Sequence, residues 1–316
     1  MDDAGKGHAV RRGIMLLLAT YNGGQFLGKQ IDSLAAQTVD DIDILVSDDG
    51  SADRTLEVLR TRAAGWPKGG MRLLEGPGRG FAENFRHLVH AAGDRHAYYA
   101  FCDQDDVWHR DKLARALAWH ARQDAGRPAL YCTRTRLVDA DGAPIGLSPL
   151  FPHPPGFRNA LVQSLAGGNT MVLNAAAFDL LGRSLERTGI LMHDWWSYLI
   201  VSGAGGVVHY DPAPSLDYRQ HGGNAIGGAV GLWQRPARLL ALLGGRYTAW
   251  SDANLAALDR CAPLLTPDAR AAVGQFKAVR AARGPAALAR LRASGLYRQT
   301  RKGNVAMWAA AFLGKL

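Results

Sequence analysis

Short apolar runs alternate with segments of helical periodicity over the first two thirds of the chain. Such runs are typical of buried strands, and apolar residues that recur every three or four positions indicate helices packed on a sheet. Strands are predicted at 14–19, 42–47, 71–74, 97–102, 130–138, 167–173, 206–210 and 215–219. Helices are predicted at 26–35, 55–62, 81–90, 112–121 and 175–186, with another beginning at His193. This alternation predicts an α/β fold with a mostly parallel central sheet.

Acidic residues come directly after two of these strands: Asp48 and Asp49 after one, and Asp103, Asp105 and Asp106 after another. Because the carboxyl ends of parallel strands meet at one edge of a sheet, ligands bind there. Asp103 and Asp105, one residue apart, can converge on one hard divalent cation that keeps positions open for phosphate oxygens. The pattern predicts a metal–diphosphate site, although an Asp-x-Asp pair taken alone is more often an ordinary surface turn.

Two further loops at this edge carry polar groups with alternative interpretations. Asp48 and Asp49 could hydrogen-bond a base edge or a ribose hydroxyl, or one of them could simply cap the next helix. The glycine-rich loop 76–80 could let its backbone and Arg79 approach a diphosphate, with Asn84 one turn into the following helix. The alternative for this loop is an ordinary turn and helix cap.

Asp194 is predicted at the N-terminus of a helix, where the helix dipole favours an ionised carboxylate. Beside His193, and with Trp195 and Trp196 able to stack on a sugar, it could be the general base that deprotonates a hydroxyl group. An N-terminal cap followed by two core tryptophans explains the same pattern. Further on, Arg219 provides a cation and His221 an imidazole, and these could bind a diphosphate or a metal. The alternative is an ordinary polar turn.

Near the end of the chain the composition changes, and Ala, Leu and Arg become the main residues. From residue 231 onward there are fourteen Lys and Arg, three Asp and no Glu, a net charge of +11, whereas residues 1–230 sum to −2. We therefore expect an α/β domain at 1–230 and a basic helical region at 231–316. That asymmetry predicts an anionic partner for the second region, a membrane surface rather than nucleic acid.

Two helix starts are expected in this basic region. Residues 266–268, Thr-Pro-Asp, combine a cap, a proline at the first position and an acid in the first turn. Asn304 is predicted to cap a last helix, on which Val305, Trp308 and Phe312 share one face between lysines. This amphipathic helix could lie on a membrane, or the helices could pack on the domain and leave a solvated basic face.

The remaining composition favours a globular cytoplasmic protein. The apolar fraction of 47% suits a packed core, and the three cysteines are scattered without metal-like spacing, which is typical of a reducing compartment. The first apolar run, 14–19, is too short for an export signal, and no unbroken apolar segment of about 18 residues occurs.

Seven short segments, taken in chain order, carry a resemblance to a known family. They are Leu-Ala-Thr-Tyr-Asn at 18–22, Val-Ser-Asp-Asp-Gly-Ser at 46–51, Phe-Ala-Glu-Asn-Phe at 81–85, Asp-Gln-Asp-Asp-Val-Trp at 103–108, Gly-Asn-Thr at 168–170, His-Asp-Trp-Trp at 193–196 and Tyr-Arg-Gln-His-Gly-Gly-Asn at 218–224. Their order and spacing resemble inverting family 2 glycosyltransferases of the GT-A fold, over roughly 14–227. The fourth, sixth and seventh are similar to those of the rhamnosyltransferase-like branch, which builds bacterial surface polysaccharides.

The resemblance implies a role for each matching residue. The donor-binding residues would be Thr20, Tyr21, Asn22, Asp48, Asp49, Arg79, Asn84, Asp103 and Arg219. Asp105, with Asp103 and His221, would hold Mg²⁺ or Mn²⁺. The acceptor cleft would be formed by Gly167, Gly168, Asn169, Trp195 and Trp196. Asp194 would be the catalytic base, because it fills the place of the family's Glu-Asp motif, with His193 in place of the Glu.

The implied reaction is a metal-dependent hexosyl transfer from a nucleoside-diphosphate sugar, by resemblance dTDP-L-rhamnose, to a saccharide or lipid-linked acceptor. A single displacement needs no covalent intermediate, so no nucleophilic Ser or Cys is required. The Gln-x-x-Arg-Trp segment of processive members is absent, which argues against a polymerase. A lipid-linked acceptor would suit a protein peripheral to the inner face of the cytoplasmic membrane.

Two other classes of function fit the acidic sheet edge. A nucleotidyltransferase that makes an activated sugar would share it, but no Gly-rich, Lys- or Arg-bearing phosphate clamp follows the first strand. A non-catalytic protein that binds nucleotide sugar is the third hypothesis. Release of free nucleoside diphosphate, of pyrophosphate, or of neither separates the three.

Overall fold

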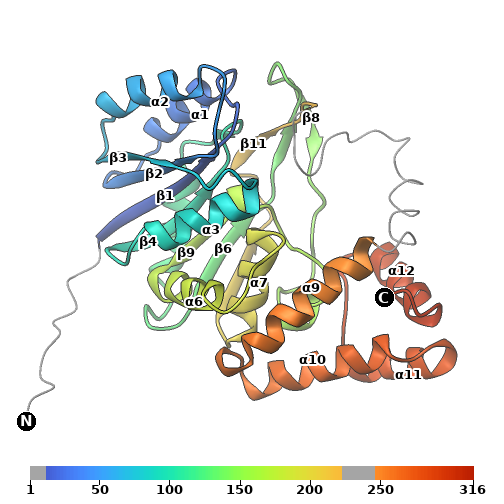
Figure 1. Cartoon of the computed structure of the whole chain (residues 1–316). Helices are drawn as coiled ribbons and strands as arrows, with labels where there is room; N and C mark the ends of the chain where they lie inside the picture. Colours follow the sequence, from blue (N-terminus) through green and yellow to red (C-terminus); the bar gives the residue numbers. More distant parts are fainter. Residues whose placement is uncertain (1–11, 223–245) are drawn as a thin grey trace, which may run out of the picture.

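The computed structural model describes residues 12–222 and 246–316, and a seven-stranded sheet forms its centre (Figure 1). The strand order is β10-β6-β9-β4-β1-β2-β3, and only β9 runs antiparallel to its neighbours. These strands are β1 (Arg12–Thr20), β2 (Ile42–Asp48), β3 (Met71–Glu75), β4 (His96–Cys102), β6 (Ala129–Thr133), β9 (Val172–Asn174) and β10 (Val207–Asp211). The expected mostly parallel α/β sheet is confirmed.

Helices cover both faces of the sheet, so most apolar positions of its central strands are buried. Within β1, Leu16 and Leu18 face α1, α2 and α4, whereas Met15 and Leu17 face α3, α6 and α7. The covering helices are α1 (Leu27–Ala35), α2 (Thr55–Ala64), α3 (Phe81–Ala91), α4 (Lys112–His120), α6 (Ala175–Leu185) and α7 (His193–Gly203). All six were expected, to within a few residues at each end.

A second sheet of four short strands lies beside the carboxyl ends of the first. Its order is β5-β11-β7-β8, made of β5 (Val107–Trp108), β7 (Arg136–Val138), β8 (Pro144–Leu147) and β11 (Leu216–Arg219). The single strand predicted over 130–138 was wrong, since β6 and β7 belong to different sheets. The strand predicted over 167–173 is instead a 3₁₀ turn, η1 (Gly168–Thr170), followed by β9.

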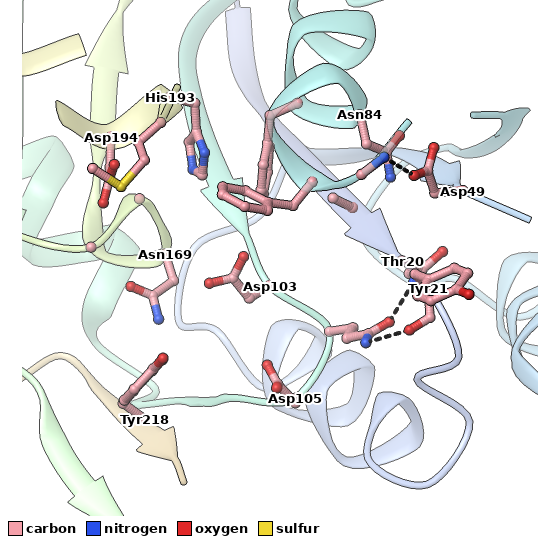
Figure 2. A pocket seen from close by; sticks show the side chains of 18 of the residues that line it. Thr20, Tyr21, Asp49, Asn84, Asp103, Asp105, Asn169, His193, Asp194 and Tyr218 are labelled. Carbon is pink, nitrogen blue, oxygen red and sulfur yellow. Dashed lines mark hydrogen bonds between the residues drawn. The ribbon is translucent and has the colours of Figure 1, made fainter. Parts of the chain in front are cut away.

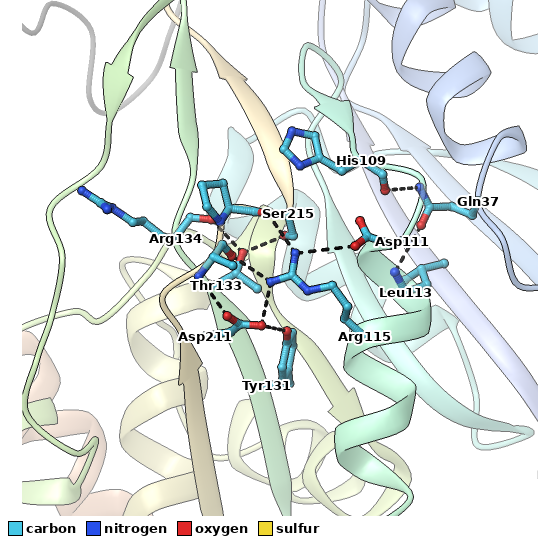
Figure 3. A network of polar contacts seen from close by, with 12 residues as sticks. Gln37, His109, Asp111, Leu113, Arg115, Tyr131, Thr133, Arg134, Asp211 and Ser215 are labelled. Carbon is cyan, nitrogen blue, oxygen red and sulfur yellow. Dashed lines mark hydrogen bonds and ion pairs between the residues drawn. The ribbon is translucent and has the colours of Figure 1, made fainter.

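A network of polar side chains fixes the corner between the two sheets (Figure 3). The carboxylate of Asp211 accepts hydrogen bonds from Arg115 at 2.6 Å and from the hydroxyl of Tyr131 at 2.5 Å. The hydroxyls of Thr133 and Ser215 lie 2.6 Å apart. These bonds tie the end of β6 to the start of β11. They explain the break after Thr133, because the chain must leave the large sheet there to enter the small one.

The C-terminal helices gather at one side of the α/β domain, drawn orange to red in Figure 1. They are α9 (Arg246–Arg260), η3 (Ala262–Leu264), α10 (Pro267–Arg280), α11 (Gly284–Ser294) and α12 (Arg301–Phe312). Together with the short α5 (Phe157–Ala160), they contribute side chains to the larger of the two clusters of buried apolar residues. The boundary expected at residues 230 and 231 lies outside the described residues. In the parts that are described, no helix is long and apolar enough to cross a membrane.

One of the two predicted caps in this region is confirmed and the other is wrong. The hydroxyl of Thr266 accepts a hydrogen bond from the amide of Ala269 and caps α10. α12 is capped by Thr300, not by Asn304. The side chain of Asn304 instead accepts from the amide of Arg298 at 2.8 Å and donates to its carbonyl at 2.7 Å. Asn304 therefore holds the preceding connector.

Candidate active site

A cavity of about 960 Å³ opens at the carboxyl edge of the sheet and is called the main cavity here (Figure 2). It lies where the loops after β1, β2, β3 and β4 meet the segment before η1 and the start of α7. The predicted site residues that line it are Thr20, Tyr21, Asp49, Asn84, Asp103, Asp105, Gly167, Gly168, Asn169 and Asp194. Acids from distant parts of the chain thus share one cavity, as the strand-end argument requires.

Asp48 lies beneath the loops that form one wall. Its carboxylate accepts from the hydroxyls of Thr20 at 2.8 Å and Ser51 at 2.6 Å, and from the amide of Ser51. Asn22, with a positive φ of 47°, donates its amide to Ser51 and accepts from the amide of Ala52. Neither Asp48 nor Asn22 lines the main cavity. Their contacts join the loops after β1 and β2, so they shape this wall from behind.

Asp49 fixes the glycine loop that follows β3. Its two carboxylate oxygens accept from the amides of Gly78 and Gly80, each at 2.7 Å. Both glycines have positive φ, 64° and 89°, which other residues rarely adopt. Asp49 therefore holds a preformed loop, and it caps no helix. Arg79, predicted to reach a diphosphate, has an exposed side chain that does not line the main cavity.

Gln104, between the two predicted metal ligands, was missed by the sequence argument. Its side-chain oxygen accepts from the amide of Tyr21 at 2.8 Å, and its side-chain nitrogen donates to the Tyr21 carbonyl at 2.9 Å. A Cβ added to Gly23 would lie 2.1 Å from the Gln104 oxygen, so a side chain at position 23 would displace this amide. This amide pair holds the acidic loop against the loop after β1. In the sequence, the position of Gln104 between two acidic residues was the signal that could have identified it.

Two acids in the main cavity, Asp103 and Asp194, have raised pKa values. Burial, with the charges of Asp105 and Asp194 nearby, raises the pKa of Asp103 to about 7. Burial raises the pKa of Asp194 to about 6, although its carboxylate accepts from the amide of Trp195 at 2.6 Å. Among the described residues, no hydrogen bond reaches the carboxylate of Asp103. A cation bound in the cavity would favour the ionised forms of these carboxyl groups.

The donor atoms around this charge suit a divalent cation. His221 Nε2 lies 2.7 Å from a carboxylate oxygen of Asp105, and Asp103 faces the same cavity. Two carboxylates and an imidazole match the ligands of Mn²⁺, and the carboxylates alone those of Mg²⁺. Within 12–222 and 246–316, no three such residues converge on one metal position. A metal ion bound here would therefore take phosphate or water oxygens as its remaining ligands.

Arg219 does not reach the main cavity, contrary to the prediction that it binds the donor. It is 2% exposed, and its guanidinium donates to the carbonyls of Asp105 at 3.0 Å and Ala140 at 2.8 Å. It also stacks over the ring of Phe26, 4.9 Å from the centroid. Arg219 positions the loop that carries Asp105. The sequence shows the cation but not the carbonyls that surround it.

The two tryptophans after Asp194 have different surroundings. Trp196 is 1% exposed and its indole donates to the hydroxyl of Ser184, so it lies in the core and the prediction of acceptor contact is wrong. The indole of Trp195 donates to the carbonyl of Ala160 at 2.7 Å. One side of its ring borders a second, smaller cavity.

His193 supports the floor of the main cavity as a neutral ring. It stacks on Phe85 with centroids 3.7 Å apart, and burial lowers its pKa to about 3. A Cβ on Gly168 would lie 2.0 Å from His193 Nε2, so the backbone of η1 rests directly on the imidazole. A glutamate would place a charge in this apolar contact. The histidine is therefore a packing residue here.

Asn169 is held toward the main cavity by a residue to which no role was assigned. Its amide nitrogen donates to the carboxyl group of Asp106 at 2.5 Å. Asp106 is fully buried, and burial with its acidic neighbours raises its pKa well above the usual range. Asp106, the third acid of this loop, thus orients Asn169 through a hydrogen bond.

Comparison with solved structures defines the class of protein. The chain superposes on the crystal structure of S. aureus TarS 1-349 in complex with UDP-GlcNAc with a TM-score of 0.53, at 14% identity over 74% of this chain and 66% of that one. For GalNAc-T7 with UDP, GalNAc and Mn²⁺ the TM-score is 0.52, at 14% identity over 75% and 50%. The fold is the GT-A fold of glycosyltransferases.

Sequence comparison then gives the family. The model of glycosyl transferase family 2 matches residues 16–169. The dTDP-rhamnosyl transferase RfbG of Shigella flexneri is 25% identical over 70% of this chain and 78% of its own length. The amylovoran biosynthesis glycosyltransferase AmsB of Erwinia amylovora is 27% identical over 48% of this chain and 50% of its own. The chain is a glycosyltransferase whose residues 16–169 match the family 2 model, and it is similar to a rhamnosyltransferase.

Proposed function

We propose that this glycosyltransferase moves L-rhamnose from dTDP-L-rhamnose to a hydroxyl group of a saccharide or lipid-linked acceptor, with inversion at the anomeric carbon, in the synthesis of a bacterial surface polysaccharide. The observation that carries the proposal is the meeting of Asp49, Asp103, Asp105 and Asp194 in one cavity of a GT-A fold. The similarity to the Shigella rhamnosyltransferase supports the choice of donor.

The chain's own groups divide the work. The preformed loops held by Asp48, Asp49 and Gln104 receive the nucleoside and its phosphates through backbone groups. Asp194, at the N-terminus of α7, takes the proton of the acceptor hydroxyl as that oxygen attacks the sugar. A pKa of about 6 keeps this base ionised at neutral pH and still basic enough to accept a proton.

Mg²⁺ or Mn²⁺ would be held by Asp103 and Asp105 together with phosphate or water oxygens, while His221 would contact Asp105. The fit rests on the half-buried carboxylate of Asp103, which accepts no hydrogen bond from the described residues, and on the contact between Asp105 and His221. The bound ion would neutralise charge on the leaving diphosphate. We assign no diphosphate contact to Arg79 or Arg219, because neither side chain lines the main cavity.

The direct test is a donor panel. Purified protein is incubated with divalent cation and with dTDP-rhamnose, UDP-, GDP- and other dTDP-sugars, and released nucleoside diphosphate is measured with and without candidate acceptors. We expect dTDP release with dTDP-rhamnose, and more of it with acceptor. Pyrophosphate release would indicate a nucleotidyltransferase. Donor binding with no release from any donor would contradict the proposal.

The acceptor is proposed to lie at the inner face of the cytoplasmic membrane, with α12 in contact with the lipid. Val305, Trp308 and Phe312 lie on one face of α12 and are 70%, 37% and 46% exposed. Lys302 and Lys315 are exposed close by. An apolar face bordered by cations suits an anionic lipid surface.

Vesicle sedimentation tests the membrane contact. We expect the full chain to sediment with vesicles that contain phosphatidylglycerol, and much less with pure phosphatidylcholine. Trp308→Ala combined with Val305→Ser should release it while leaving transfer to a soluble acceptor intact. Equal sedimentation of this variant and the wild type would place the lipid contact elsewhere.

A further inference from the structure

A second cavity of about 500 Å³ adjoins the main cavity and is called the side cavity here. The two share Thr135, Ser148, Pro149, Gly167, Met192 and Asp194 as lining residues. Asp194, the proposed base, therefore stands where the two cavities meet. A hydroxyl group that Asp194 deprotonates must belong to a molecule whose other parts extend away from the donor. The side cavity is the space available to them.

The C-terminal helices complete the wall of this cavity. Trp250 comes from α9 and Arg298 from the connector between α11 and α12, and both line the side cavity together with Trp195. Trp250 meets Trp195 edge to face, with ring centroids 6.4 Å apart at 82°. Figure 1 shows α9 running from beside α12 toward the base of the α/β domain. The helical region thus contributes directly to a cavity beside the base.

The connector that carries Arg298 is firmly held. Asn304 clamps its backbone from both sides, as described above. The next residue, Gln299, is fully buried and bonds the loop before α5 through the amide and carbonyl of His153. Its own amide donates to the side chain of Gln163, another residue that lines the side cavity. Arg298 is therefore presented at a fixed place, although it lies more than a hundred residues after Asp194 and Trp195.

The residues that line the side cavity suit a ligand with one sugar ring and one anionic group beside it. Trp250 and Phe151 offer aromatic surface, which suits the apolar face of a pyranose ring, and the buried Trp195 packs against Trp250. Among the lining residues that the structure describes, Arg298 is the one cation and Asp194 the one acid. A guanidinium binds phosphate or carboxylate oxygens with paired hydrogen bonds.

On this basis, and resting on the proposed function, we propose that the side cavity binds the acceptor as a pyranose ring next to an anionic group, with Trp250 against the ring and Arg298 on the anion. The anion is either a phosphate that links the sugar to its carrier or the carboxylate of an acidic sugar. Acceptor choice then depends on the C-terminal helices, while donor choice depends on the loops of the sheet.

The test measures binding of three monosaccharides to the full chain by saturation-transfer NMR, with and without dTDP. The probes are N-acetylglucosamine 1-phosphate, glucuronate and neutral N-acetylglucosamine. We expect one anionic probe to bind about tenfold more tightly than the neutral one, as a charged hydrogen bond allows. A preference for the sugar phosphate indicates a phosphate-linked acceptor, and a preference for glucuronate an acidic sugar.

Variants locate the binding. Arg298→Gln should abolish the preference for the anion and leave dTDP affinity unchanged, whereas Arg292→Gln, an exposed arginine on α11, should keep the preference. Trp250→Ala should weaken all three probes, and Trp250→Phe should restore them. Thermal unfolding confirms that each variant is folded. A preference that survives Arg298→Gln, or no preference in the wild type, overturns the inference. Absence of dTDP binding counts instead against the proposed donor, because dependence on Arg298 is measured without dTDP as well.

Discussion

The main cavity and the side cavity meet at Asp194 but are built in different ways. Four carboxylates line the main cavity, and the pKa of two of them is raised. The side cavity has an aromatic lining, and its residues come from segments that only tertiary packing brings together. In the main cavity, the carboxylates lower the stability of the protein without ligands but provide charge that can bind a donor and a cation. In the side cavity, the packing of the aromatic side chains stabilises the fold. Five changes test this contrast.

The largest effect is expected at the junction itself. Asp194→Asn keeps the shape of the side chain but removes the base, so the rate of transfer should fall roughly 10²- to 10⁴-fold. Affinity for dTDP, measured by calorimetry, should stay within a factor of about two. Asp40→Asn is the matched control, since that carboxylate is 91% exposed and pairs only with Lys68 at the surface. Transfer at the wild-type rate by Asp194→Asn would show that the base is another residue.

Trp196 and Trp250 separate packing from ligand contact. Trp196→Ala should lower the free energy of unfolding by about 3–5 kcal/mol, because the whole side chain is buried. Trp250→Ala should cost far less stability, since that ring is half-buried, and should act on acceptor binding instead. Denaturant unfolding of both variants gives the comparison. Equal losses of stability would mean that Trp250 is a core residue and the side cavity has no acceptor role.

Metal dependence should reside in the main cavity alone. Asp105→Ala is expected to lower transfer by roughly 10²-fold, because charge on the leaving diphosphate loses its stabilisation. Chelation with EDTA should lower the wild-type rate by a similar factor and leave the variant almost unchanged. Binding of neutral N-acetylglucosamine in the side cavity should be the same in both proteins. If EDTA had no effect on the wild type, the proposed metal ligands would be wrong.

The pH dependence of the rate follows from Asp194. Its pKa is raised to about 6, and the base must be ionised, so turnover should fall about tenfold per pH unit below 6 and level off above 7. The measurement is turnover at saturating donor and cation from pH 4.5 to 8.5. Donor affinity over the same range is the control. A rate independent of pH between 5 and 7 would contradict the assignment.

The smallest effect concerns stability without ligands. Because the folded pKa of Asp103 is raised to about 7, stability present below pH 4 is lost as the pH rises through 7. Asp103→Asn should remove this loss and stabilise the protein by about 1–2 kcal/mol at pH 8, after solvent screening is allowed for. Thermal unfolding in EDTA at pH 8 and pH 4.5 measures the difference, which should disappear at the lower pH. A less stable variant at pH 8 would mean that Asp103 has a partner in the folded protein.

Prediction from sequence worked best where a residue's surroundings follow from its own segment. The strands and helices of the α/β domain follow from local periodicity, and acids placed after strands had to meet at one edge. It failed where surroundings come from elsewhere. Arg219 looked like a donor ligand but faces the carbonyls of Asp105 and Ala140, and Asn304 looked like a cap but clamps Arg298.

The sequence by itself determined the α/β alternation, the acidic edge of the sheet and the resemblance to family 2 glycosyltransferases, because each depends on short segments and their order. Only the tertiary structure decided which polar groups line a cavity and which support it from behind. It alone brought Trp250 and Arg298 beside Asp194. The physical reason is that burial and hydrogen bonding depend on the elements packed against a residue, and those elements come from far along the chain.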